Sequence, residues 1–189
     1  MKRALLRLCA AAILFATASL AGAQGAPGFR VGFAGGATFP VEDTKDIYDT
    51  GYHGSLMFLI NFPAVPVGFR FEGVYARMNE QSLPGSSGRV EIGGGTANLV
   101  LGPRLLLVKP YFIGGAGVYR LKFTHNGSFA FEDTQTPQFG FNVGGGIAFS
   151  LGPAATLFLE ARYTRVDTDV NPLVGSHLSF VPVTLGLVF

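Results

Sequence analysis

The strongest constraint on the fold is an alternation of large apolar residues with small or polar residues along most of the chain. In 138–151, positions Phe139, Phe141 and Val143 are large and apolar, whereas the positions between them are Gly or Asn. Successive side chains of a β-strand point to opposite faces, so a period of two residues indicates strands with one apolar face. Beyond residue 23, no unbroken apolar stretch reaches the ~20 residues that a membrane-spanning helix needs. The sequence therefore predicts an all-β fold.

Eight segments carry this alternation, and each is long enough to cross a bilayer as a tilted strand, which takes ~9–11 residues. Short connections marked by Pro or Gly alternate with longer polar loops, which is typical of a barrel with a short-turn end and a long-loop end. We predict an eight-stranded antiparallel up-and-down transmembrane β-barrel. Its predicted strands are 28–39, 51–62, 66–78, 89–101, 110–124, 138–151, 155–167 and 176–189, and its long loops are 40–50, 79–88, 125–137 and 169–175.

The direction of the apolar faces separates a membrane barrel from a soluble, lipocalin-like barrel, which remains a minor alternative. The interior of an eight-stranded barrel is only just filled by side chains, so it cannot hold all of the large apolar residues. The chain is 48 % hydrophobic and 14 % charged, against a usual charged share of roughly 25 %. We therefore expect the apolar faces to point into lipid. In 110–124 this rule places Tyr119, Leu121 and Phe123 outward, and Arg120 and Lys122 inward.

The first 23 residues have the composition of a cleaved signal peptide. A positive start with Lys2 and Arg3 precedes an apolar run at 8–20, and the small residues at 21–23 suit a signal peptidase. We thus expect residues 1–23 to be removed and 24–189 to form the barrel domain. The remaining 166 residues would contain no cysteine, because the one cysteine is Cys9. Three basic residues would leave with the signal, so 11 basic and 12 acidic residues would remain and no nucleic-acid-binding charge is left.

At the C-terminal end, alternating hydrophobic residues from Val181 to Leu187 end on the aromatic residue Phe189. This segment resembles the assembly signal of small outer-membrane barrels, the family typified by the OmpA membrane domain and OmpX, and 111–117 also reads like a strand of such barrels. The resemblance covers the whole chain after the signal. It implies outer-membrane localisation, with periplasmic chaperones and the barrel-assembly machinery as partners during biogenesis. The assembly-signal residues are Val181, Val183, Leu185, Leu187 and Phe189.

Seven charged residues share the parity that is predicted to face the lumen. Glu72 and Glu160 have enough basic neighbours to be paired, and a buried carboxylate without a partner would be costly. We expect a salt-bridged network that fills the interior. The alternative is a constriction, in which a basic excess of five to two would favour anions. The predicted lumen residues are Arg30, Arg70, Glu72, Arg120, Lys122, Glu160 and Arg162.

One weak catalytic pattern lies in the last strand, where His177 and Ser179 share a face. Some eight-stranded barrels that deacylate lipid A use an outward-facing Ser-His pair with an acidic third residue. The ten residues after Ser179 hold no Asp or Glu, and catalysis needs an oriented base. His53 and Ser55 have the same spacing on the inward face, and His125 has no partner at metal-ligand spacing. We predict no enzyme activity, no cofactor and no metal.

Together these observations predict a monomeric, non-enzymatic integral outer-membrane protein. Its long extracellular loops would contribute to envelope integrity or to surface interactions, with outer-membrane lipid and lipopolysaccharide as its surroundings. The first alternative is a narrow pore that prefers anions. The second, less favoured, is a lipid-modifying outer-membrane enzyme.

Overall fold

The computed structural model describes residues 28–62, 65–81, 87–103, 108–126, 137–168 and 177–189. The predicted signal peptide at 1–23, and the boundary after it, lie outside these residues. So do most of the predicted long loops after 81, 126 and 168.

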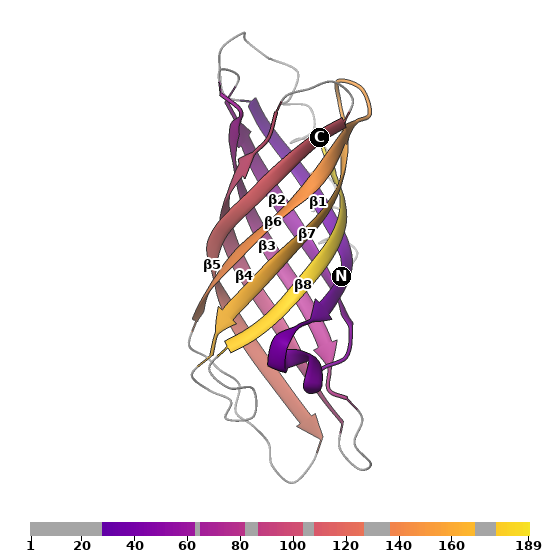
Figure 1. The fold of residues 1–189 in the computed structure, drawn as a ribbon, viewed down its shortest axis with the longest axis vertical. Coiled ribbons are helices and arrows are strands. Elements are labelled where there is room, and N and C mark those ends of the chain that lie inside the picture. Colours follow the sequence, from indigo (N-terminus) through magenta and orange to yellow (C-terminus); the bar gives the residue numbers. More distant parts are fainter. Residues whose placement is uncertain (1–27, 63–64, 82–86, 104–107, 127–136, 169–176) are drawn as a thin grey trace, which may run out of the picture.

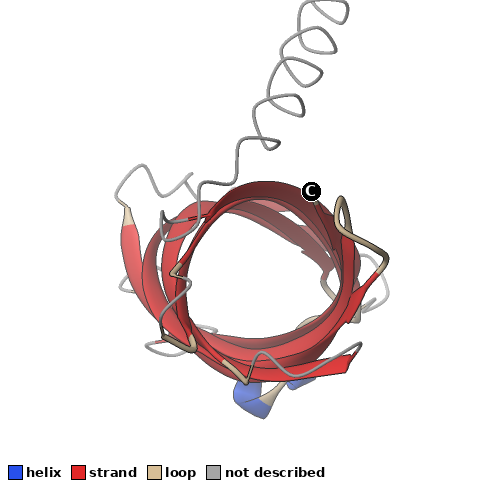
Figure 2. Cartoon of the chain, turned by 90° about the horizontal axis from the view of Figure 1, so that it is seen from above, coloured by secondary structure: helices blue, strands red, loops and turns tan. Residues whose placement is uncertain are grey.

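Eight antiparallel strands form one closed barrel in which each strand pairs with its neighbours in sequence and β1 pairs with β8 (Figures 1 and 2). Closure leaves no strand edge without a partner. The predicted fold is confirmed, and all predicted strand ends lie within two residues of the observed ones. The strands are β1 Gly28–Pro40, β2 Gly51–Asn61, β3 Val67–Asn79, β4 Ser87–Leu101, β5 Val108–Asn126, β6 Gln138–Ser150, β7 Thr156–Asp167 and β8 His177–Val188.

The two ends of the barrel differ. The first strand starts and the last strand ends at the short-turn end, whereas the 3-10 helix η2, Glu42–Asp46, lies at the long-loop end (Figure 1). The longest strands, β4 with 15 residues and β5 with 19, extend the wall toward the long-loop end. Among the described residues, no helix is long and apolar enough to span a bilayer.

Large apolar side chains cover the middle of the outer wall. On β6, Phe139, Phe141 and Val143 are 58 %, 42 % and 56 % exposed. A continuous apolar surface of this kind is unfavourable in water and matches a hydrocarbon surrounding. The outward direction of the apolar face is therefore confirmed for β6.

On β5 the predicted direction is wrong. Tyr119, Leu121 and Phe123 are buried inside the barrel, with exposures of 3 %, 1 % and 8 %, whereas Arg120 and Lys122 are exposed on the outside. The rule that the apolar face meets lipid holds only where lipid surrounds the wall. Near the long-loop end it fails, because there the barrel interior is filled by apolar side chains.

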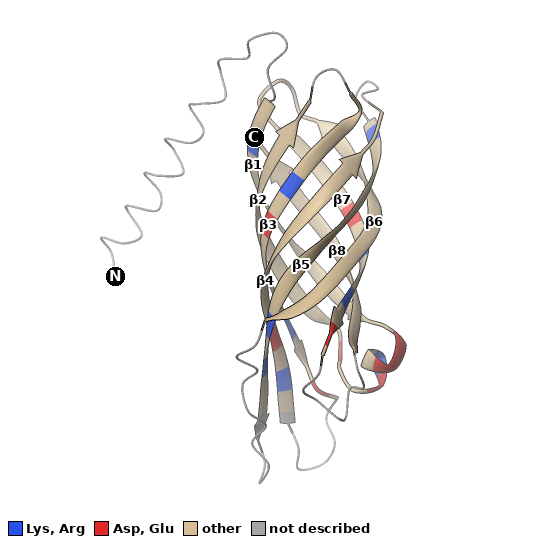
Figure 3. Cartoon of the chain, turned by 90° about the vertical axis from the view of Figure 1, so that its left-hand side faces the viewer, with Lys and Arg blue, Asp and Glu red and all other residues tan. Residues whose placement is uncertain are grey.

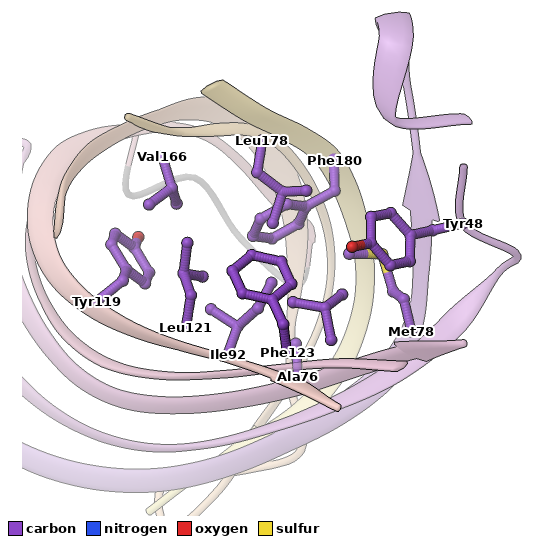
Figure 4. Packing of buried hydrophobic residues seen from close by; sticks show 11 residues of the cluster. Tyr48, Ala76, Met78, Ile92, Tyr119, Leu121, Phe123, Val166, Leu178 and Phe180 are labelled. Carbon is purple, nitrogen blue, oxygen red and sulfur yellow. The ribbon is translucent and has the colours of Figure 1, made fainter. Parts of the chain in front are cut away.

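These side chains form the apolar cluster, a group of buried residues inside the long-loop end of the barrel (Figure 4). Its members come from β3, β4, β5, β7, β8 and the segment before β2, and Tyr48 joins it through an isolated bridge to Glu80. The cluster resembles the core of a soluble barrel. It comprises Tyr48, Ala76, Met78, Val90, Ile92, Tyr119, Leu121, Phe123, Val166, Leu178 and Phe180.

Candidate functional site

Four charged residues form a closed ring across the middle of the lumen, here called the charge quartet: Arg70 and Glu72 on β3, and Glu160 and Arg162 on β7. On each strand the two residues are two positions apart, so both point to the same face. Arg70 Nη2 lies 2.5 Å from Glu160 Oε2, and Arg162 Nη1 lies 2.6 Å from Glu72 Oε2. The ring closes along each strand, with 2.8 Å from Arg162 Nε to Glu160 Oε1 and 3.4 Å from Arg70 Nε to Glu72 Oε1.

The quartet is almost fully buried and electrically balanced. The side chains of Arg70, Glu72, Glu160 and Arg162 are 3 %, 0 %, 0 % and 8 % exposed. Burial of a charge is costly unless a partner and hydrogen bonds compensate it. Each charge here contacts two of opposite sign, so the ring holds its members in place and leaves no carboxylate free.

Uncharged side chains add hydrogen bonds to one oxygen of each carboxylate. Asn98 Nδ2 donates to Glu72 Oε2 at 3.0 Å, and the Tyr111 hydroxyl donates to Glu160 Oε2 at 2.8 Å. Asn142 Nδ2 in turn donates to Asn98 Oδ1 at 2.9 Å. Sequence reasoning does not single out these three residues. Alternation alone places Tyr111 on the lipid face, and the inward parity of the two asparagines is the one signal for them.

Glycines on β6 create the space that Arg162 and Tyr111 occupy. A Cβ atom at Gly144 would lie 2.6 Å from Cα of Arg162, and one at Gly146 would lie 2.6 Å from the Tyr111 hydroxyl. Both distances are shorter than real Cβ contacts allow. The glycine cluster of β6 thus lets the wall approach the quartet closely.

The quartet separates two cavities of different size. Toward the long-loop end lies a space of about 40 Å³, where His53 is hydrogen-bonded through Nδ1 to Thr38 Oγ1 at 3.0 Å and through Nε2 to Thr184 Oγ1 at 2.9 Å. Toward the short-turn end a vestibule of about 400 Å³ is lined by Arg30 and Lys109, among others. Both ring nitrogens of His53 are engaged by threonines, which does not fit a catalytic pair with Ser55.

The remaining predicted lumen residues do not join the quartet. Arg30 lies in the vestibule and donates to Thr156 Oγ1 at 3.0 Å and to the Val188 carbonyl oxygen at 3.1 Å. Arg120 and Lys122 are on the outer surface, so their assignment to the lumen is wrong. Among the predicted lumen residues the basic excess of five to two therefore falls to three to two, and within the quartet the two charges of each sign balance.

The His177 and Ser179 pair lies on the outer wall beside η2, and an acidic residue does approach it from another element. Glu42 Oε2 is 3.6 Å from His177 Nε2, and Glu42 Oε1 accepts a hydrogen bond from the Tyr163 hydroxyl at 3.0 Å. Ser179, however, is fully buried, and its Oγ lies 3.2 Å from the Tyr163 hydroxyl. A buried hydroxyl is not accessible to a lipid ester.

The same residues attach η2 to the barrel wall. The backbone N–H of Val41 donates to the Ser179 carbonyl, and the N–H of Ser179 donates to Thr44 Oγ1, at 3.1 and 3.0 Å. Hydrogen bonds from Ser179 and Tyr163, with some help from nearby His177, hold the pKa of the Glu42 carboxyl below its usual value. The geometry is that of a docked helical turn. Among the described residues, no three His, Cys, Asp or Glu side chains are grouped to hold a metal ion.

The residues of the predicted assembly signal lie on the outer face of β8 and just beyond its end. Val183, Leu185 and Phe189 are 36 %, 55 % and 39 % exposed, and Val181 and Leu187 are partly covered. Strand β8 pairs with both β1 and β7, so it closes the barrel. Recognition of this segment by assembly machinery stays a prediction.

Comparison with known proteins identifies the family. The sequence profile described as "Outer membrane protein beta-barrel domain" matches residues 8–188. The chain belongs to this outer-membrane β-barrel family. The family resemblance and the outer-membrane location predicted from the sequence are thus confirmed.

Solved structures of similar fold include Neisserial surface protein A and the outer membrane protein OprG from Pseudomonas aeruginosa. The first is 17 % identical, with a TM-score of 0.62, and the match covers 85 % of this chain and 95 % of that one. The second is 15 % identical, with a TM-score of 0.50 and coverage of 89 % and 99 %. At these identities the likeness shows the shared fold. A search of curated protein sequences finds no significant match.

Proposed function

We propose that this outer-membrane barrel is a closed, non-enzymatic protein that contributes to envelope integrity or to surface interactions at its long-loop end. The observation that carries the proposal is the filling of the lumen by successive layers of side chains. The charge quartet crosses the middle of the lumen, and the apolar cluster fills it toward the long-loop end. A transport path would have to pass both layers.

Each layer resists an ion for a different reason. In the quartet both carboxylates already have ion-pair or hydrogen-bond contacts with Arg70, Arg162, Asn98 and Tyr111, so an ion would have to displace existing partners. In the apolar cluster, Leu121, Ile92 and Met78 are at most 1 % exposed and offer no polar atom to replace the hydration of an ion. The two layers together support a structural rather than a conducting interior.

The narrow anion-preferring pore loses its main support. That alternative depended on Arg120 and Lys122 lying in the lumen, and both are on the outer wall. The vestibule at the short-turn end does carry Arg30 and Lys109, but it ends at the quartet. The enzyme alternative likewise requires an accessible Ser179, which is fully buried.

Conductance of the reconstituted protein tests the proposal. The chain, refolded and inserted into a planar bilayer, should show no discrete openings, and insertion should be verified separately by protease protection in vesicles. Arg162→Ala should also be silent, because the apolar cluster remains in place. Discrete openings of the unmodified protein, with an ion preference that changes in Arg162→Ala, would contradict the proposal and make the lumen the functional site.

A further inference from the structure

Basic residues gather on the outer wall of three neighbouring strands at the long-loop end. Figure 3 shows most of the charged ribbon segments toward this end. The outward-facing charged residues of β3, β4 and β5 are four basic residues and one acidic residue, here called the basic patch. They are Arg77, Arg89, Glu91, Arg120 and Lys122.

The strand register brings the basic patch together. Arg77 lies opposite Glu91, and Glu91 lies opposite Lys122, so one row crosses three adjacent strands over ~10 Å. Glu91 is already engaged, at 3.2 Å from Arg89 Nε and 4.0 Å from Arg77 Nη1. Arg120 and Lys122 are exposed, and within the described part of the chain neither has an ion-pair partner. Among the described residues, Arg120 and Lys122 thus carry two positive charges without an ion pair on the outer wall of the barrel.

In the next row toward the middle of the barrel, a glycine leaves open space on the outer wall. Here Tyr75 lies opposite Gly93, and Gly93 lies opposite Arg120. A Cβ atom at Gly93 would meet nothing within 4 Å, and the Tyr75 ring is 45 % exposed. Tyrosines are typical of the boundary between the hydrocarbon region and the headgroups. This row therefore marks the level at which the wall passes from apolar to charged.

One row further, the wall is grooved. Gly73 lies opposite Gly95, and no atom lies within 3.8 Å of a Cβ placed at either glycine. A shallow groove of about 610 Å³ runs over both glycines. An adjoining groove of about 580 Å³ reaches Tyr75. The apolar side chains that flank the two grooves are Phe33, Leu56, Phe58, Phe71 and Val118.

We propose that this wall binds a phosphorylated lipid of the outer leaflet. A phosphate would be held by Arg120 and Lys122, since Arg and Lys are the residues that bind phosphate oxygens, and an acyl chain would occupy the groove over Gly73 and Gly95. Charge and groove lie on the same strands in consecutive rows, which matches a molecule with an anionic head and an apolar tail. A soluble polyanion would use the charge but not the groove. The inference goes beyond the proposed function and is independent of whether the lumen conducts.

Titration of the purified barrel in neutral detergent with diphosphorylated lipid A tests this site. Removal of both uncompensated charges in Arg120→Gln/Lys122→Gln should weaken binding by about 30-fold, on the basis of the usual contribution of a basic residue at an anionic lipid surface. The matched control is Lys45→Gln/Lys109→Gln, which removes two positive charges from η2 and the vestibule. Its affinity should stay within about 2-fold. Equal loss in both double variants would overturn the site and indicate a nonspecific effect of net charge.

A second variant separates a lipid from other phosphate or polyanion ligands. Gly73→Leu places a side chain in the groove, at a position where no atom lies within 4 Å of an added Cβ. This substitution should weaken the binding of lipid A. Inorganic phosphate should bind poorly to the unmodified protein and to all variants, so its binding should not change. If heparin binding, but not lipid A binding, were lost in Arg120→Gln/Lys122→Gln, the patch would be a site for soluble polyanions and the lipid proposal would be wrong. Unchanged lipid A affinity in Gly73→Leu would also contradict it.

Discussion

The middle of the barrel and its long-loop end are built with opposite polarity. In the middle, the interior holds the charge quartet while the outer wall carries side chains such as Val143 and Phe141. At the long-loop end, the interior holds the apolar cluster while the outer wall carries the basic patch. One closed sheet passes through both regions without a break in the alternation of its side chains. The comparison shows that the surroundings of the outer wall decide which face of a strand is apolar. Where lipid surrounds the wall the outer face is apolar, and at the long-loop end the inner face is.

Strand β5 shows this change within a single element. Phe112, toward the short-turn end, points outward and is 75 % exposed, whereas Leu121 points inward and is 1 % exposed. Residues 112 and 121 are nine positions apart, an odd number. The regular alternation of one uninterrupted strand therefore places their side chains on opposite faces. The outer face of β5 thus changes from a lipid-facing surface to a charged one at Arg120.

The largest expected effect comes from breaking the charge quartet. Glu72→Ala leaves Arg70 and Arg162 without one of their partners in a buried site, and this should lower the free energy of unfolding by ~3–5 kcal/mol. Because the chain contains no tryptophan, urea unfolding in lipid vesicles should be followed by far-UV circular dichroism. The double variant Glu72→Gln/Arg162→Met, which removes one charge of each sign, should be clearly less destabilised than Glu72→Ala. Equal losses would show that the pairing is not what stabilises this layer.

A similar or slightly smaller loss is expected in the apolar cluster. Leu121→Ala removes a fully buried side chain and should lower the free energy of unfolding by ~2–5 kcal/mol, as is usual for a leucine core position. The same unfolding assay applies. The matched control is Lys122→Ala on the opposite face of the strand, which should change stability by less than ~0.5 kcal/mol. The prediction would be contradicted if the two substitutions had the same effect.

A charge placed on the outer wall should distinguish the two regions directly. Val143→Arg puts a cation on the lipid-facing middle of the outer wall and should cost ~2–4 kcal/mol, the usual range near the bilayer midplane. The cost of a cation falls to ~0–1 kcal/mol near the interfaces. Thr124→Arg, on the outer face of β5 beyond Lys122, should therefore be nearly neutral. Equal costs at both positions would mean that the basic patch is not at the membrane boundary.

The smallest effect concerns the attachment of η2. The pKa of Glu42 is lowered in the folded protein, so its stabilising contribution is present above its unfolded pKa and is lost as the pH falls through the lowered folded value. Hydrogen exchange of the Val41 and Ser179 amides checks this, with Glu42→Gln measured at each pH so that the intrinsic pH dependence cancels. The protection ratio between the two forms should fall toward one only in acid. A ratio independent of pH would refute the role of the carboxylate.

Much of the fold is predictable because alternation and turn residues are local signals. They locate all eight strands, and the charged residues of β3 and β7 indicate the quartet from their parity alone. The same rule does not predict which side of β5 points into the lumen, since both of its sides carry large residues. The point at which the surroundings of the strand change from lipid to water is also not visible in its alternation. The approach of Glu42 to His177 and Ser179 depends on how a loop folds against two distant strands, and no spacing in the sequence indicates it.

Accessibility of single cysteines tests the reversal of polarity most directly. Cys9 is the one cysteine of the chain, so Cys9→Ala allows one thiol to be placed at a time by Leu121→Cys, Lys122→Cys or Val143→Cys. In vesicles, a membrane-impermeant maleimide should label position 122 rapidly and positions 121 and 143 slowly, and a lipid-attached quencher should quench a fluorophore at position 143 much more than one at position 121. Rapid labelling at 121 with protection at 122 would contradict the account.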